Sequence, residues 1–255
     1  MSSFLAGPIG VAYHLVFWLT HVLTPLTGSL AAAAAIVAFT AGVRLLLMPL
    51  SFYGMRGQAR IAAVQPRVQE LRARYARQPD KLQAELGALY AQEAGGMMAG
   101  CLPLLLQLPF FSVMYRLFLS RTIGGRPNGL LRRSFFGTPL GSHWLAGAGP
   151  VSGQGLVFLG LFAALALAAV LAARTARAAA PPPAGDAGAA AGAMRALTRL
   201  LPFTTLVIAA FVPLAAGLYL LTTSTWTLAE RTLLRRRIAP PATGAAPLPL
   251  AGSAR

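Results

Sequence analysis

The stretch AFTAGVRLLLMP, residues 38–49, decides the fold class of this 255-residue chain. It lies in an apolar run from Leu30 to Phe52, in which Arg44 is the only charged residue. About 20 apolar residues are enough to cross the hydrocarbon core of a membrane. An arginine at that depth costs about 2.5–3.5 kcal/mol on insertion scales, and such residues usually serve a function. The stretch therefore predicts a membrane-spanning helix that carries one charge inside it.

The composition of the whole chain favours an integral membrane protein. Hydrophobic residues make up 56% of the chain and charged residues 11%, whereas a typical soluble domain is about 25% charged. The net charge of +16 would suggest nucleic-acid binding in a soluble protein. In a membrane protein the same charge is expected from the basic loops that set its orientation. The single cysteine, Cys101, excludes an internal disulfide.

Five membrane-spanning helices are predicted, which makes the fold class an all-α integral membrane protein. Three spans are clear from hydropathy: residues 30–52, 97–119 and 154–173. The last apolar block, residues 200–228, would be about 44 Å long as one straight helix, which is too long for a single span. Because basic residues flank it on both sides, we expect two short spans with a turn near Pro213.

Basic residues lie mainly on one side of these predicted spans. The segments 53–96, 174–199 and 229–255 hold 16 of the 22 lysines and arginines, whereas the loop 120–153 holds four and residues 1–29 hold none. The positive-inside rule therefore places the N-terminus outside and the C-terminus in the cytoplasm. We expect a multi-pass protein of a bacterial plasma membrane, with residues 1–29 as an interfacial segment on the outer surface.

The segment 53–96 predicts an antiparallel helical hairpin in the cytoplasm. Apolar residues recur every three or four positions on both sides of RQPDK, residues 77–81. Pro79 and Asp80 suit the first turn of a second helix. The exposed faces carry arginines, among them Arg72, Arg74 and Arg77, which are either simply solvated or contact headgroups or a partner.

Two further cytoplasmic segments are predicted to be disordered. Residues 174–199 contain a low-complexity run of Ala, Pro and Gly that cannot build a core. The basic tail 229–255 contains the cluster Arg235, Arg236 and Arg237. Anionic lipid and ribosomal RNA are both open as partners of this cluster.

No catalytic constellation is present in the sequence. HExxH, G-x-S-x-G and P-loop motifs are absent, so we expect neither an enzyme nor a bound metal or cofactor. All six acidic residues lie outside the predicted spans or at an end of one, so no carboxylate is expected to pair with Arg44. A transporter coupled to protons or cations usually needs such a carboxylate. A small-solute transporter or channel is kept as the alternative function.

Polar side chains within the predicted spans are candidates to line a groove with Arg44. Thr40 lies one turn before Arg44 on the same helix face. The other candidates are Gln107 in the second span and Thr222, Thr223 and Trp226 in the last. A hydrated, positively charged groove is the preferred interpretation. The alternative is that Arg44 extends about 12 Å to the cytoplasmic interface.

Four segments of the sequence resemble the YidC/Oxa/Alb family of membrane protein insertases. They are TAGVRLLLMPL (40–50), LQAELGALYAQE (82–93), GCLPLLLQLPFFSVMYRLF (100–118) and VPLAAGLYLLTTSTWTLAE (212–230). The resemblance implies five spans around a hydrophilic groove that is open to cytoplasm and lipid. It also implies an activity that inserts and helps fold membrane proteins, alone or with the Sec translocon, without nucleotide or metal.

The resemblance also suggests roles for individual residues. The groove arginine of the family matches Arg44, the threonine one turn earlier matches Thr40, and the groove glutamine matches Gln107. Trp226 and its neighbouring hydroxyls fall on the polar face of the last span.

The partners that the resemblance implies are nascent membrane proteins, the Sec translocon, the ribosome, the signal recognition particle or its receptor, and anionic lipids. The hairpin arginines and the basic tail named above are the expected contact regions. The large periplasmic domain of Gram-negative members is absent from the chain, so we expect the short form of Gram-positive, actinobacterial-like bacteria.

Overall fold

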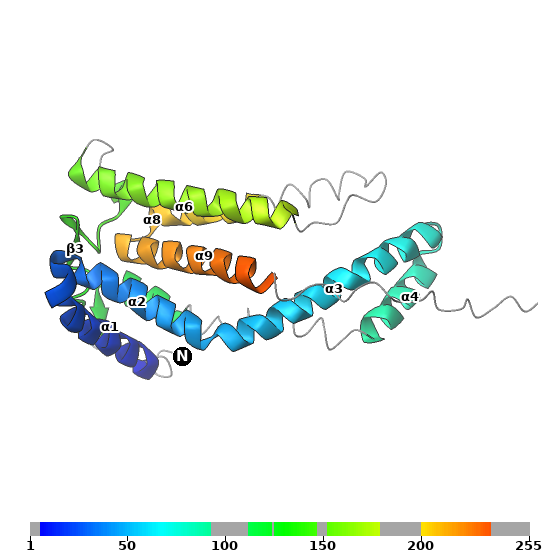
Figure 1. Cartoon of the computed structure of the whole chain (residues 1–255), viewed down its shortest axis with the longest axis horizontal. Helices are drawn as coiled ribbons and strands as arrows, with labels where there is room; N and C mark the ends of the chain where they lie inside the picture. Colours follow the sequence, from blue (N-terminus) through cyan, green and yellow to red (C-terminus); the bar gives the residue numbers. More distant parts are fainter. Residues whose placement is uncertain (1–5, 93–111, 124, 147–151, 179–199, 236–255) are drawn as a thin grey trace, which may run out of the picture. The chain divides into compact units, whose positions relative to one another are not determined.

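A computed structural model describes residues 6–92, 112–123, 125–146, 152–178 and 200–235. These residues fall into two compact units. The first unit comprises residues 1–50 and 103–230, and the second comprises residues 51–102 and 231–255. The described part is mostly helical (Figure 1).

The first unit begins with two helices that lie side by side. α1 (Ala6–Thr27) and α2 (Ala31–Leu46) are joined by the 3-10 turn η1 (Gly28–Leu30) (Figure 1). Gly28 has a φ of 55°, a conformation that glycine adopts at little cost, and this lets the chain turn back. The buried face of α2 is largely alanine, which allows the close approach of the two helices.

α2 ends earlier than the predicted span 30–52. The backbone N–H of Leu47 still bonds the carbonyl of Val43 at 3.0 Å, but Leu47 is a turn residue and α3 (Met48–Arg74) starts after it. Pro49 has no N–H to donate to the carbonyl of Leu45, which accounts for a break here. Residues 30–52 are thus shared between two helices.

The predicted outer loop 120–153 contains ordered structure. β1 (Thr122–Ile123) pairs with β2 (Arg126–Pro127), and β3 (Ser134–Phe135) pairs with β4 (Thr138–Pro139), each as a minimal antiparallel hairpin. Phe136 and Gly137 connect β3 to β4, both with positive φ, as a two-residue primed turn requires. A 3-10 turn, η2 (Trp144–Ala146), follows.

Three further helices are described in the first unit: α6 (Gly153–Ala178), α8 (Thr204–Phe211) and α9 (Leu214–Arg235), with the 3-10 turn η3 (Leu201–Phe203) before α8; residues 112–119 are helical as well. The chain breaks between α8 and α9, where Val212 is extended and Pro213 follows. α6 and α9 pack closely at Gly217, because a Cβ there would lie 2.5 Å from Cδ2 of Leu161.

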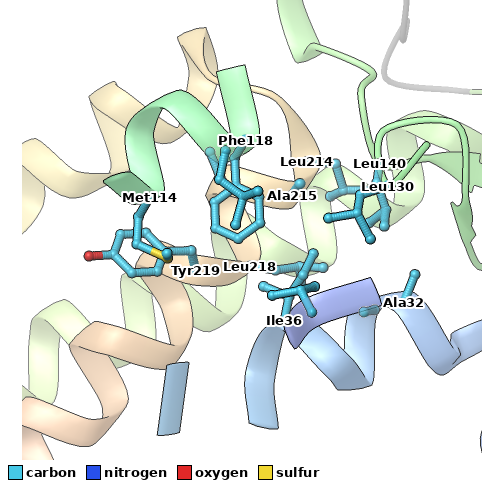
Figure 2. Close-up of a cluster of buried hydrophobic side chains, with 14 of the residues drawn as sticks. Ala32, Ile36, Met114, Phe118, Leu130, Leu140, Leu214, Ala215, Leu218 and Tyr219 are labelled. Atoms are coloured by element: carbon cyan, nitrogen blue, oxygen red, sulfur yellow. The ribbon is translucent and has the colours of Figure 1, made fainter. Parts of the chain in front are cut away.

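The core of the first unit lies at the N-terminal end of α9. Figure 2 shows Ile36 of α2, Met114 and Phe118 of the helical residues 112–119, and Leu218 and Tyr219 of α9 packed together. The rings of Phe118 and Tyr219 are 6.1 Å apart. The outer loop contributes two further buried side chains, Leu130 and Leu140.

The second unit contains most of α3 and all of α4 (Pro79–Gln92). A short turn separates the helices, in which the N–H of Gln78 bonds the carbonyl of Tyr75 at 2.9 Å. Pro79 is the first residue of α4, which confirms the predicted start of this helix. Val64 and Val68 are buried on one face of α3. The antiparallel pairing of the predicted hairpin stays a prediction.

Two described helical stretches are long and apolar enough to cross a membrane. They are Ile9–Leu46, which includes α1 and α2, and Gly153–Arg177. The predicted span 97–119 is described only at residues 112–119, while most of the linker 174–199 and of the tail 229–255 lies outside the described residues. The count of five spans stays a prediction.

Candidate functional site

Arg44 lies in the last turn of α2, and its side chain is half-buried. The side chains that act on it electrostatically are Tyr219 and Glu230, both from α9. These three residues belong to the first unit. Arg44 is therefore positioned by two helices that are far apart in the sequence.

Glu230 bears on an expectation from the sequence. We expected no carboxylate to pair with Arg44, and Glu230 lies close enough to act on it electrostatically. The predicted last span ended at residue 228, before the first charge. α9 instead continues unbroken to Arg235, so Glu230 is carried on the same helix as the polar residues of that span. Glu230 is buried, with 8% of its surface exposed.

A row of polar side chains follows one face of α9. Tyr219, Thr223, Trp226 and Glu230 are spaced by four, three and four residues, so they share a face of the helix. Three buried atoms in this row have no hydrogen-bond partner within the described part of the chain: Oγ1 of Thr223, Nε1 of Trp226 and Oε1 of Glu230. The Thr223 hydroxyl lies next to that of Tyr219.

This row is unusual for a folded interior. A buried polar atom without a partner costs about 1–3 kcal/mol, and native proteins contain few of them. Three on one helix face near Arg44, one of them on the Glu230 carboxylate, make this face a candidate binding surface. Thr223 and Trp226, which the sequence suggested, lie in this row, whereas Tyr219 and Glu230 were missed.

The hydroxyls of Thr40 and Thr222 are engaged differently. Thr40 is fully buried, and its Oγ1 donates to the carbonyl of Ile36 at 2.7 Å. Thr222 donates to the carbonyl of Leu218 at 2.8 Å. Each hydroxyl proton is therefore used within its own helix, and only the oxygen lone pairs remain available. The groove role of both residues stays a prediction, and Gln107 lies outside the described residues.

The basic residues suggested as partner contacts lie mainly at the surface of the second unit. Arg72, Arg74 and Arg77 are all exposed. Arg235 is the last residue of α9, and Arg236 and Arg237 lie outside the described residues. A contact with a partner stays a prediction for all six.

The outer loop fixes the start of α9, which carries the polar row. The N–H of Leu214 bonds the carbonyl of Ser142, and the N–H of Ala215 bonds that of Leu140, both at 2.9 Å. His143 and Pro213 form an isolated β-bridge. These bonds satisfy N–H groups that the first turn of a helix leaves without partners.

The chemistry available at this site is binding. It offers a cation, a carboxylate, and hydroxyl and indole groups that have no partner among the described residues. Within the described residues, no cluster of three or more His, Cys, Asp or Glu could hold a metal ion. The site can attract charged or hydrogen-bonding segments without forming a covalent bond.

Comparison with known proteins identifies the family. The profile of the family described as 60Kd inner membrane protein matches residues 22–241. The chain belongs to this family. The match covers both helices of the Arg44 site and confirms the resemblance to the YidC/Oxa/Alb proteins.

Curated relatives in this family carry the name membrane protein insertase YidC. The relative from Helicobacter pylori is 40% identical over 82 residues, which is 32% of this chain and 15% of the relative. That from Chlamydia trachomatis is 35% identical over 118 residues, 46% of this chain and 14% of the relative. That from Acidiphilium cryptum is 44% identical over 87 residues, 34% of this chain and 14% of the relative. The matched part thus spans about a seventh of the length of these relatives.

Proposed function

We propose that this protein is a membrane protein insertase and chaperone, which inserts membrane proteins and helps them fold, alone or with the Sec translocon. The family and the names of its relatives support this function. The observation that carries it here is the position of Arg44 beside the polar row of α9, with three buried polar atoms unpartnered.

In this proposal the chain has five spans in a bacterial plasma membrane, with the N-terminus outside and the C-terminus in the cytoplasm. The excess of basic residues in the segments 53–96, 174–199 and 229–255 supports this orientation. Arg44 and the polar row of α9 would then line a hydrophilic groove that is open to the cytoplasm.

The groove lowers the barrier for a polar segment to enter the membrane. Hydrocarbon offers no hydrogen bonds, so each unpaired polar group of a substrate costs several kcal/mol there. Thr223 offers a hydroxyl oxygen and Trp226 an indole N–H in its place, neither of them satisfied by the residues that the structure describes. The apolar part of the substrate then moves sideways into lipid, and burial of about 20 apolar residues drives the reaction forward.

Glu230 provides a counter-charge for Arg44 when no substrate is bound in the groove. A buried arginine without a counter-charge is strongly unfavourable, and Glu230 supplies that charge while the groove is empty. An acidic segment of a substrate can take the place of Glu230 beside Arg44. The carboxylate near Arg44 is then exchanged for one of the substrate, so binding need not begin from an isolated cation.

The proposed partners are nascent membrane proteins as substrates, with the Sec translocon, the ribosome, the signal recognition particle or its receptor, and anionic lipids. The exposed basic surface of α3 and the following turn, at Arg72, Arg74 and Arg77, supports a contact with acidic or phosphate-bearing partners. The basic tail at residues 235–237 would serve the same purpose beside the membrane.

Photocrosslinking from α9 to a nascent single-span protein tests the groove. A crosslinker at Thr223, in the polar row, should capture the substrate during its insertion. The matched control is Thr225, which is exposed on another face of the same helix. Equal capture from both positions would contradict a groove at this face.

Reconstitution without Sec tests the activity itself. Purified protein in liposomes should protect the translocated end of a single-span substrate from added protease. Protection only when Sec is present would indicate that the protein assists folding as a chaperone and does not insert substrates itself. Flux of small solutes without any protection would favour the transporter or channel.

A further inference from the structure

A cavity of about 620 Å³ lies in the first unit, at the side of α1. α1, the helical residues 112–119 with the residues that follow, and the β1–β2 hairpin form its walls. Its polar lining consists of Tyr13, His14, Arg116, Ser120, Thr122 and Arg126. Arg44 and the polar row of α9 are not part of it, and the proposed insertase activity makes no use of it.

The charge of this cavity is wholly positive. Arg116 and Arg126 contribute two guanidinium groups, and no acidic residue lines the wall. The sequence has no Asp or Glu before Glu70 and none between Glu93 and Asp186, so every lining segment is free of carboxylates. The positive-inside rule does not account for these arginines, because the proposed orientation places Arg126 in the outer loop and Arg116 near the outer end of the second span.

The donors around the cavity suit a phosphate group. Guanidinium groups bind phosphate oxygens in pairs through parallel N–H groups, and these are among the stronger hydrogen bonds in proteins. The hydroxyls of Tyr13, Ser120 and Thr122 add neutral donors, and the imidazole of His14 completes the rim. The cavity thus offers several converging donors and two positive charges to an anion.

α1 carries an exposed apolar face beside this cavity. Five large apolar side chains recur every three or four residues and are 45–81% exposed: Val11, Leu15, Trp18, Val22 and Leu26. A third face of the helix, with Ile9, Ala12 and Val16, is buried in the core. At 3.6 residues per turn, His14 lies between the cavity and the apolar face. Basic donors and an open apolar surface therefore meet along one helix.

We propose that this cavity binds the phosphate of an anionic phospholipid, whose acyl chains lie along the exposed apolar face of α1. The continuity of the two surfaces favours a lipid over free phosphate, because one phospholipid molecule joins a phosphate to apolar chains and can contact both surfaces at once. The glycerol-linked headgroup contacts Arg116 and Arg126, while Leu15 and Trp18 contact the chains next to it. None of the residues that line it belongs to the basic C-terminal tail.

Binding to the purified full-length chain tests this proposal. Delipidated protein in mild detergent is titrated with short-chain phosphatidylglycerol, with short-chain phosphatidylcholine and with inorganic phosphate. We expect saturable binding of phosphatidylglycerol, weakened about tenfold or more by Arg116→Gln with Arg126→Gln. Inorganic phosphate should bind far more weakly than phosphatidylglycerol. Equal affinity for both would overturn the lipid assignment.

A matched double variant controls for net charge. Arg132→Gln with Arg133→Gln also removes two positive charges, at exposed positions of the loop 120–153 that do not line the cavity. It should leave the affinity for phosphatidylglycerol within about twofold. An equal loss in both double variants would overturn the cavity as the site, since the effect would then follow net charge.

The apolar part of the site has its own test. Leu15→Ser with Trp18→Ser should weaken binding of phosphatidylglycerol but leave binding of inorganic phosphate unchanged. Unchanged binding of phosphatidylglycerol in this double variant would overturn the acyl-chain contact. A thermal unfolding curve for each variant shows that it is folded. None of these measurements involves insertion, so their failure would leave the proposed insertase function standing, and a failure of that function would leave the lipid site standing.

Discussion

The side-chain amide of Asn128 donates a hydrogen bond to the backbone carbonyl of Leu117 at 2.8 Å. It also reaches the carbonyl of Ser120 at 3.1 Å, and its Oδ1 accepts from the N–H of Leu130 at 3.1 Å. Asn128 is only 2% exposed. One loop residue thus caps the C-terminal end of the helical residues 112–119 and holds the next turn of the loop.

Replacing Asn128 should therefore destabilise the first unit. Asn128→Ala leaves two buried carbonyls and one N–H without their partner, so we expect a loss of about 1–3 kcal/mol. The change appears as a lower unfolding midpoint in detergent. Arg132→Ala, at an exposed position of the same loop, should stay within about 0.5 kcal/mol of the parent. Equal midpoints for the two variants would show that the cap contributes nothing.

Gly217→Ala should disturb the contact between α6 and α9. Its new Cβ would meet Cδ2 of Leu161 at 2.5 Å, so the leucine must shift and we expect a cost of about 1–3 kcal/mol. Gly160→Ala is the matched control, because a Cβ there meets nothing within 4 Å. Alanine favours a helix over glycine by about 0.5–1 kcal/mol, so the control should be neutral or stabilising. Thermal unfolding of both proteins checks the difference, and its reversal would contradict the close packing.

Arg44→Ala should impair the insertion of substrates with acidic translocated tails, because the groove loses its only cation among the described groove residues. Arg44→Lys should largely retain activity, since it keeps the charge. Rescue of a host depleted of its own insertase measures both variants. Full rescue by Arg44→Ala for every substrate would reduce Arg44 to an anchor.

Glu230→Gln should change which substrates are inserted. The variant leaves Arg44 without its internal counter-charge, so acidic tails should insert as well as before or better, while neutral tails insert less well. Protease protection of paired substrates, identical except for the charge of the tail, measures this ratio. Glu85→Gln, at an exposed position of α4, is the control and should not alter the ratio. An unchanged ratio in Glu230→Gln would show that substrate carboxylates do not compete with Glu230.

The helical character of the chain and the segment that carries Arg44 could be predicted from hydropathy alone. The partner of Arg44 could not, because a span predicted from hydropathy stops at the first charge, whereas a helix continues as long as its backbone bonds are made. α9 therefore extends past residue 228 and includes Glu230. The four-three-four spacing of Tyr219, Thr223, Trp226 and Glu230 was a usable signal in the sequence.

The structure of the loop 120–153 could not be predicted from sequence patterns, for a different reason. Its strands have two residues each, which is too short for any alternation of apolar and polar side chains. The bonds that order it are long-range, as between Asn128 and Leu117 or between Leu140 and Ala215. The residues with positive φ in its two hairpin turns, Gly125 in one and Phe136-Gly137 in the other, left a local trace.

The bonds from Leu140 and Ser142 to the start of α9 also bear on how the protein is made. A ribosome releases the loop long before it releases α9, so the N-terminal N–H groups of the last helix meet an acceptor that is already in place. The carbonyls of the loop therefore lack their α9 partners while α6 and the rest of the chain up to residue 214 are synthesised. Assembly of the Arg44 site is then completed only when α9 has been made. A nascent chain that ends before Leu214 lacks the helix on which this site depends.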